Sequence, residues 1–141
     1  MDAFRIVEVL DLQPHPEGGM YAETWRADAN LGERATGTAI YYLLRAGERS
    51  HWHRVDAAEI WHYYAGDALE LRISADGRSV ETARLGFDLD GGERPQVVVP
   101  PDAWQTARSL GAWTLVGCTV SPGFEFDRFE LAPPAWEPSE A

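Results

Sequence analysis

The sequence predicts an all-β protein with one short helix at its start, and three observations support this class. Short segments of strand-like composition follow one another at regular intervals from residue 38 onward, and one more precedes them. Gly, Pro and Asp separate these segments, as expected for turns. No helical period of useful length occurs after residue 11. Many short strands at this spacing predict either a sandwich or a closed barrel.

The first expected element is an amphipathic helix over residues 3–11. Phe4, Val7 and Leu10 recur at a spacing of three, and Ile6 lies four residues before Leu10. Asp2 is the expected N-cap, and the prolines at positions 14 and 16 end the helix. We expect this helix to cover one end of a sheet.

The strands follow in order. Residues 20–26 alternate between two sets of side chains, with Tyr21, Glu23 and Trp25 on one face. A polar loop over residues 28–37 separates this strand from the others. The further expected strands are residues 38–44, 51–55, 59–65, 68–73, 79–85, 96–99, 104–109 and 113–120. The proline-containing end, residues 133–141, is expected to fray or to lie along the surface.

Composition excludes several classes of function. Acidic residues outnumber basic ones by 23 to 12, and the net charge is −11. Such a chain repels phosphate backbones and anionic membrane surfaces, so we expect neither nucleic acid nor membrane as a partner. The 141 residues are expected to form one domain (1–141). With a single cysteine and no recognisable targeting segment, the expected location is cytoplasmic.

Most of the candidate metal-binding and catalytic residues lie in residues 47–66, GERSHWHRVDAAEIWHYYAG. His51 and His53 are two residues apart, so on one strand they would point the same way. If the chain turns after them, Glu59 opens the next strand and faces the same cavity. Two imidazoles and one carboxylate on one wall can bind Fe(II), Mn(II) or a similar ion. They can also be polar groups of a pocket that bond to one another without metal, and both interpretations are kept.

This stretch resembles the first motif of the cupin superfamily, in which a Gly, an HxH pair, a Glu and a closing Gly span one hairpin. The second cupin motif, PxGxxH, corresponds here to PPDAWQ, where Gln105 replaces the His and Asp102 replaces the Gly. The resemblance thus adds Gln105 to the candidate metal ligands His51, His53 and Glu59. The candidate ions are Fe, Mn, Ni and Zn.

A closer resemblance is to a subfamily of small, single-domain cupins of unknown function. It rests on HPEGG (15–19), TAIYYLL (38–44), WHRV…EIWHYYAG (52–66), RPQVVVP (94–100) and GCTVSPGF (117–124). The resemblance covers about residues 15–131, which are the expected barrel core. It implies a cupin-type double-stranded β-helix, that is, a jelly-roll barrel with a pocket inside.

Three residues are candidate catalytic groups: Glu23, His53 and Tyr63. In the subfamily the strand at residues 20–26 lines the cavity, which makes Glu23 a candidate acid or base. Alternatively, Glu23 forms a salt bridge to an arginine such as Arg54 or Arg108. His53 or His51, paired with Glu59 or Glu23, would abstract a proton next to a carbonyl. Tyr21 or Tyr63 would be the proton donor.

Other residues have structural interpretations. His62 falls on the opposite strand parity from Glu59 and should face away from the pocket. His15 is expected to cap nearby backbone, or alternatively to hang over the barrel mouth. Cys118 is expected to be a buried, inert thiol. We expect two or three of five aromatic side chains to be core and the others to line the cavity; the five are Trp52, Trp61, Tyr63, Trp104 and Trp113.

The resemblance implies a small-molecule-binding protein. We expect an enzyme of isomerase, epimerase or metal-dependent type, acting on a small polar or sugar-like substrate inside the barrel. The alternative is a barrel that binds a small ligand without catalysis. Because cupin sheets commonly pack against a second copy, we also expect a homodimer.

Overall fold

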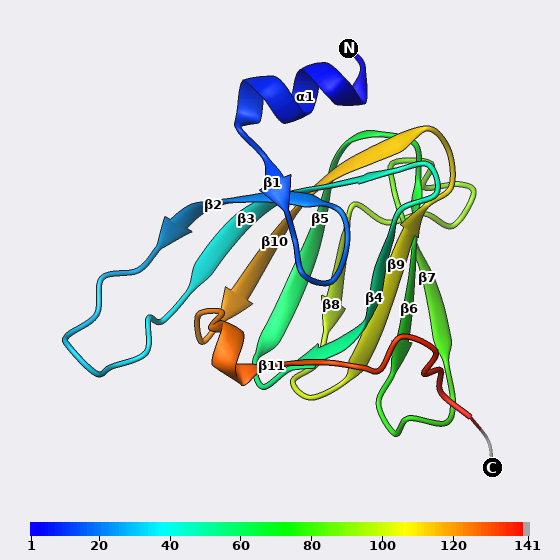
Figure 1. Ribbon diagram of the computed structural model, residues 1–141. Coiled ribbons are helices and arrows are strands. Elements are labelled where there is room, and N and C mark those ends of the chain that lie inside the picture. The colour runs from blue at the N-terminus through cyan, green and yellow to red at the C-terminus, as the bar shows by residue number, and fades with distance from the viewer. Residues whose placement is uncertain (140–141) are drawn as a thin grey trace.

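The computed structural model describes residues 1–139 and shows two antiparallel sheets that face each other (Figure 1). One sheet has the strand order β1-β2-β3-β10-β5-β8, and the other has the order β11-β4-β9-β6-β7. Strands distant in sequence are therefore neighbours, as in a jelly roll, which confirms the predicted fold class. The first sheet comprises β1 (Gln13–Pro14), β2 (Met20–Arg26), β3 (Thr38–Arg45), β5 (Ala58–Gly66), β8 (Gln96–Val99) and β10 (Trp113–Ser121). The second comprises β4 (Arg49–Val55), β6 (Leu69–Ser74), β7 (Glu81–Leu85), β9 (Trp104–Ser109) and β11 (Phe129–Leu131).

The predicted N-terminal helix is present as α1 (Ala3–Leu10). The Asp2 carboxylate accepts a hydrogen bond from the Arg5 backbone N–H at 2.8 Å, which confirms the N-cap. Ile6 packs with Leu12 and Leu43, so the helix covers one end of the first sheet on its outer face (Figure 1). No helix within residues 1–139 is long and apolar enough to cross a membrane.

A hydrophobic core fills the space between the sheets. In β6, burial alternates so that Leu69 and Leu71 are buried and their neighbours are partly exposed. These side chains meet Tyr42, Trp61 and Val116 from the opposite sheet. This core packs the two sheets against each other. Polar side chains that also point between the sheets line a cavity beside the core.

Two short strands escaped the sequence prediction. β1 and β11 have two and three residues, too few for a periodic pattern to be recognised. A short 3₁₀ turn, η1 (Phe126–Arg128), precedes β11. Pairing fixes both strands: β1 pairs with β2, and β11 pairs with β4. These pairings place the segments at or near β1 and β11, residues 13–17 and 124–126, at the cavity.

Candidate functional site

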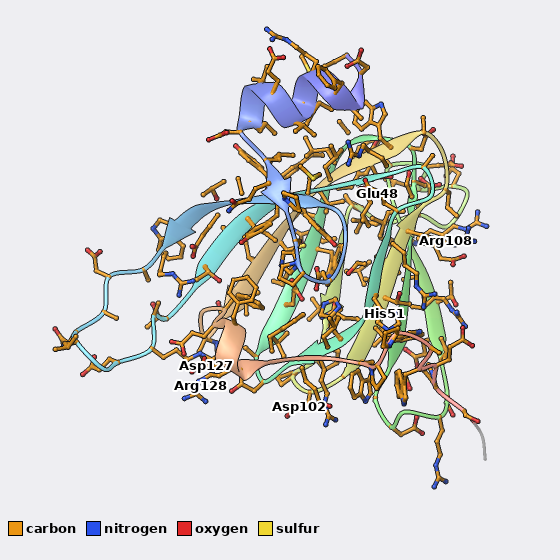
Figure 2. All side chains as sticks on the ribbon, in the orientation of Figure 1. Glu48, His51, Asp102, Arg108, Asp127 and Arg128 are labelled. Carbon is orange, nitrogen blue, oxygen red and sulfur yellow. The ribbon has the colours of Figure 1, made fainter. Side chains whose placement is uncertain are left out.

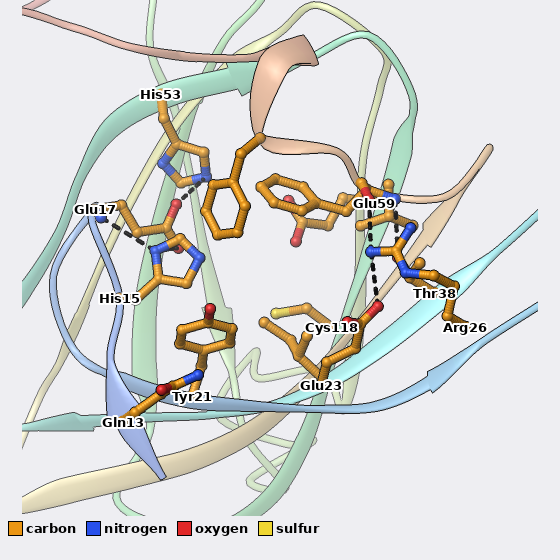
Figure 3. Close-up of a pocket in the computed structure, with 14 residues that line it drawn as sticks. Gln13, His15, Glu17, Tyr21, Glu23, Arg26, Thr38, His53, Glu59 and Cys118 are labelled. Carbon is orange, nitrogen blue, oxygen red and sulfur yellow. Dashed lines mark hydrogen bonds and ion pairs between the residues drawn. The ribbon is translucent and has the colours of Figure 1, made fainter. Parts of the chain in front are cut away.

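The cavity lies inside the barrel and has a volume of about 130 Å³. A cavity of about 150 Å³ can hold a molecule the size of benzene, so this one has room for about one small molecule or a few waters. His15, Glu17 and His53 lie on one side of the cavity, and Glu23 and Arg26 lie on the opposite side (Figure 3). The lining residues are Gln13, His15, Glu17, Tyr21, Glu23, Arg26, Thr38, Ile40, His53, Glu59, Cys118, Val120, Phe124 and Phe126.

A β-bulge in β4 separates the two histidines of the HxH pair. Ser50 pairs with Ala107 and His53 pairs with Gln105, so β4 advances three residues while β9 advances two. The extra residue breaks the alternation of side chains. His51 therefore points outward, where its Nε2 donates to the carbonyl oxygen of Pro133 at 2.9 Å (Figure 2). The prediction that both histidines face the cavity is wrong for His51 and correct for His53.

His53 forms a buried ion pair with Glu17, and Nε2 lies 2.9 Å from Oε2. Its Nδ1 donates to the carbonyl oxygen of His51 at 2.8 Å, so both ring nitrogens are engaged. Burial alone would lower the pKa of His53, but the charge and hydrogen bond of Glu17 outweigh burial and raise this pKa to about 9. Burial likewise opposes ionisation of Glu17, and the charge of His53 nevertheless lowers the Glu17 pKa. The pair is therefore imidazolium and carboxylate at neutral pH.

Glu59 is a second buried carboxyl in the cavity, and it accepts a hydrogen bond from the side-chain amide of Gln105. Gln105 Nε2 donates to Glu59 Oε1 at 2.8 Å, and Trp61 Nε1 donates to Gln105 Oε1 at 2.8 Å. The indole N–H thus fixes which end of the amide faces Glu59. Burial raises the pKa of Glu59 to about 7, although the charge of His53 and the amide hydrogen bond both favour ionisation. Gln105 supports Glu59 across the barrel interior and does not line the cavity.

A turn near the N-terminus supplies the other half of the ionisable wall. In HPEGG, His15 N–H donates to Gly19 O at 2.9 Å, and Gly18 N–H donates to His15 O at 3.0 Å. Glu17 O accepts from the His51 N–H at 2.8 Å, which ties the turn to β4. His15 caps backbone as predicted, because its Nδ1 accepts from the Glu17 N–H at 3.1 Å, and its ring also reaches the cavity.

Sequence reasoning missed Glu17. The segment was notable for its glycines, whereas its His-x-Glu spacing was a signal that could have been used. Glu17 and His53 are 36 residues apart in the chain, and only the pairing of the turn with β4 brings them together.

Glu23 lies at the cavity mouth and is paired with Arg26, with 2.7 Å between Oε1 and Nη2. The predicted salt bridge to an arginine exists, but the predicted partners are wrong. Arg54 pairs with Glu130, and Arg108 pairs with Glu70. Arg26 also donates to the carbonyl oxygen of Phe124 at 2.9 Å, which joins β2 to the segment over the cavity.

Tyr63 does not reach the cavity, contrary to prediction. It lies four residues beyond Glu59 on β5, which is about 13 Å along a strand. Its hydroxyl donates to the Gly66 carbonyl oxygen at 2.6 Å, and its ring packs against the core. His62 faces the opposite side, as predicted, and its Nε2 is 3.0 Å from Thr119 Oγ1.

The aromatic lining also differs from expectation. Trp52 and Trp61 are buried, but none of the five aromatic side chains expected to divide between core and cavity lines the cavity. Tyr21, Phe124 and Phe126 do so instead. Cys118 is buried and its pKa is raised, chiefly by burial, which agrees with an inert thiol.

The expected metal ligands do not converge as a set. His51 faces outward, His53 Nε2 is committed to Glu17, and both ends of the Gln105 amide are hydrogen-bonded. Within residues 1–139 no group of three or more His, Cys, Asp and Glu side chains is arranged to hold an ion. The residues as placed do not fit a metal centre of the predicted composition.

Residues 4–132 match the family described as Cupin superfamily (DUF985). The chain belongs to this family. A crystal structure of a Shewanella oneidensis protein has 40% sequence identity and a TM-score of 0.89, and the match covers 94% of this chain and 85% of that one. A hypothetical protein from Leishmania major has 32% identity and a TM-score of 0.86, with coverage of 96% and 90%.

This cupin also shares its fold with a domain of oxalate decarboxylase from Bacillus subtilis. The TM-score is 0.66 at 13% identity, over 87% of this chain and 31% of that one. The decarboxylase contains Mn(II) centres. At this identity the likeness concerns the fold alone.

Proposed function

We propose that this cupin is an enzyme that moves a proton at a carbon next to a carbonyl group, as isomerases and epimerases do. The observation that carries the proposal is the ionisable wall of the cavity, defined as His15, Glu17, His53 and Glu59. All four are at most 8% exposed, and all four line one small cavity. Buried ionisable groups that converge on a cavity are typical of catalytic sites.

Glu59 is the proposed base. A pKa of about 7 leaves comparable amounts of carboxyl and carboxylate at neutral pH, which suits a group that must both take and return a proton. The C–H proton moves to Glu59, and the electron pair of that bond moves toward the carbonyl oxygen to give an enolate. Return of the proton to the other face of the same carbon gives epimerisation. Where that carbon also carries a hydroxyl group, the hydroxyl proton moves to the former carbonyl oxygen, and return of the C–H proton to the former carbonyl carbon gives isomerisation.

His53 and Glu17 act as a fixed charge pair in this scheme. Both ring nitrogens of His53 are hydrogen-bonded, so the imidazolium contributes a positive charge near the reacting centre without exchanging its protons. The Glu23–Arg26 pair at the mouth would contact polar ends of the substrate, where both side chains are partly exposed. The size and mixed lining of the cavity favour a small polar or sugar-like molecule.

Proton exchange with solvent tests the proposal directly. The protein is incubated in D₂O with a set of small hydroxy-aldehydes, hydroxy-ketones and 2-oxo acids, and loss of the C–H signal is followed by NMR. Glu59→Gln should slow exchange about 100-fold or more, because it removes the base and keeps the shape. Glu130→Gln, outside the cavity, is the matched control.

The outcome also separates the two candidate functions. If ligands bind equally to the wild type and Glu59→Gln and none exchanges, the protein is a non-catalytic binding barrel. Elemental analysis of protein purified without tag or chelator accompanies the assay. A stoichiometric metal whose removal abolishes exchange would contradict a mechanism that depends only on side chains.

Association into a homodimer is part of the proposal. Its support is the apolar surface on α1 and the first sheet, where Phe4, Val9, Tyr64 and Val98 are each more than half exposed. Pairing with a second copy would cover these side chains. Light scattering at micromolar concentration should give twice the monomer mass, and a monomer mass would contradict the proposal.

A further inference from the structure

His15 has no part in the scheme above, yet its ring lies in the same cavity. It is 8% exposed, and it contacts the Tyr21 ring at 4.6 Å between centroids with the planes at 71°. The Tyr42 ring lies 5.7 Å away and Phe129 lies 6.2 Å away. Aromatic neighbours on several sides hold the imidazole in one orientation.

The hydrogen bond at Nδ1 determines where the neutral ring carries its proton. The donor is the backbone N–H of Glu17, at 3.1 Å. A backbone amide can only donate, so Nδ1 must present its lone pair, and the single proton of the neutral ring is on Nε2. The backbone of the HPEGG turn thus selects the tautomer.

The Nε2–H of His15 points into the cavity (Figure 3). Within residues 1–139 no side chain or carbonyl oxygen accepts a hydrogen bond from it, whereas His53 uses both of its nitrogens. Of the two cavity histidines, only His15 therefore offers a donor to a bound molecule.

His15 is also held neutral. Burial lowers its pKa, and the opposing effect of the Glu17 carboxylate does not restore it. Protonation would place a second proton on Nδ1, directly against the N–H of Glu17. The hydrogen bond at Nδ1 and the burial of the ring therefore both favour the neutral imidazole.

We infer that His15 is a further catalytic residue, a neutral imidazole whose Nε2–H binds the carbonyl oxygen of the substrate. This role rests on the proposed function. As Glu59 takes the C–H proton, negative charge develops on the carbonyl oxygen, and the hydrogen bond from Nε2 strengthens. The Nε2 proton stays on His15 throughout, and return of the proton from Glu59 restores both residues.

The tautomer is measured first, without any substrate. In ¹⁵N-labelled protein at pH 7, long-range ¹H–¹⁵N spectra should show His15 with an unprotonated Nδ1 and a protonated Nε2. A proton on Nδ1, whether in the other tautomer or in the imidazolium, overturns the inference. This result does not depend on whether the protein has activity.

The second measurement uses any compound that exchanges in the D₂O assay. His15→Phe should lower kcat about 100-fold or more while KM changes only a few-fold, because a donor to the developing charge is lost. His15→Gln, which can place an amide N–H near Nε2, should recover part of this loss. If His15→Phe does not fold, as judged by circular dichroism, His15→Gln and the tautomer decide.

The outcomes separate the two claims. Exchange at the wild-type rate in folded His15→Phe overturns the role of His15 and leaves the role of Glu59 intact. Absence of exchange in the wild type, with every compound, overturns the proposed function and the role of His15 together, whatever the tautomer.

Discussion

The cavity wall is built by two regions that each supply one histidine and one carboxylate. The HPEGG turn contributes His15 and Glu17. The consecutive strands β4 and β5, which belong to different sheets, contribute His53 and Glu59. The turn is held by a few backbone hydrogen bonds, whereas β4 and β5 are each paired on both sides within their own sheets. The charge pair joins the regions, because the Glu17 carboxylate lies 2.9 Å from His53 Nε2 and 3.8 Å from Nδ1 of its own neighbour His15.

Two similar sets of side chains therefore acquire different chemistry from the backbone and side-chain groups that contact them. In the turn, a backbone N–H sets the tautomer of His15. On β5 a side-chain amide hydrogen-bonds Glu59, and on β4 an ion pair keeps His53 charged. Five predictions test how far the turn and the two strands depend on each other.

The largest effect is expected from changing the turn backbone. Gly18 has φ +111°, and a Cβ there would collide with the carbonyl oxygen of Arg49 on β4. Gly18→Ala should lower the free energy of unfolding by about 4 kcal/mol, from strain and overpacking together. Gly32→Ala, at φ +82° with open space around it, should cost only about 1 kcal/mol. Urea unfolding measures both, and equal losses would contradict the close packing of the turn on β4.

The next largest effect is expected from removing the Glu17–His53 ion pair, which joins the turn to β4. Glu17→Gln leaves His53 buried without its partner and should cost about 3 kcal/mol at pH 7. The pKa of His53, measured by NMR, should fall from about 9, because the charge and the hydrogen bond of Glu17 are removed while burial, which lowers this pKa, remains. Glu59→Gln should cost far less at the same pH. A similar loss of unfolding free energy in Glu17→Gln and Glu59→Gln would contradict a stabilising ion pair between Glu17 and His53.

The same link predicts how stability depends on pH. The folded-state pKa of His53 is raised from 6.5 to about 9, so its contribution is fully present below about pH 6.5 and is lost as pH rises through 9. The free energy of unfolding should fall by about 2 kcal/mol between pH 7 and pH 9.5. His53→Gln should lack this decline, and His62→Gln should keep it. Urea unfolding at several pH values tests the sign, and a rise with pH would contradict the assignment.

A smaller effect concerns the amide behind Glu59. Trp61→Phe removes the indole N–H and leaves the buried Gln105 Oε1 without a donor, which should cost about 1.5 kcal/mol. The amide can then turn its oxygen toward Glu59, so the pKa of Glu59 should rise further above 7. Carboxyl NMR titration measures the shift. Trp113→Phe is the control, and an unchanged Glu59 pKa in Trp61→Phe would refute the role of the indole.

The smallest effect is expected at His51, the histidine that the bulge turns outward. His51→Ala removes one hydrogen bond to Pro133, which should cost about 0.5–1 kcal/mol. The pKa of Glu59 and the ion pair of His53 should not change. A shift of either in NMR titration would place His51 in the cavity after all.

Local patterns in the sequence determined the fold class, the N-terminal helix and most strands. The spacing of Phe4, Val7 and Leu10 identified α1, and turn residues between short apolar runs identified the strands. Strand parity predicted that Glu59 and His62 face opposite sides of β5. These features depend on residues close together in the chain, so the sequence displays them directly.

Tertiary structure decided which of these residues form the site. The bulge that separates His51 from His53 depends on how β4 pairs with β9, and strand parity within β4 does not reveal it. Glu17 meets His53 only because the turn docks on β4, a contact between distant segments. The charge of His53 and the pKa of Glu59 follow from burial and from partners supplied by other strands. Such properties arise from three-dimensional neighbours, and they exist only once the barrel has closed.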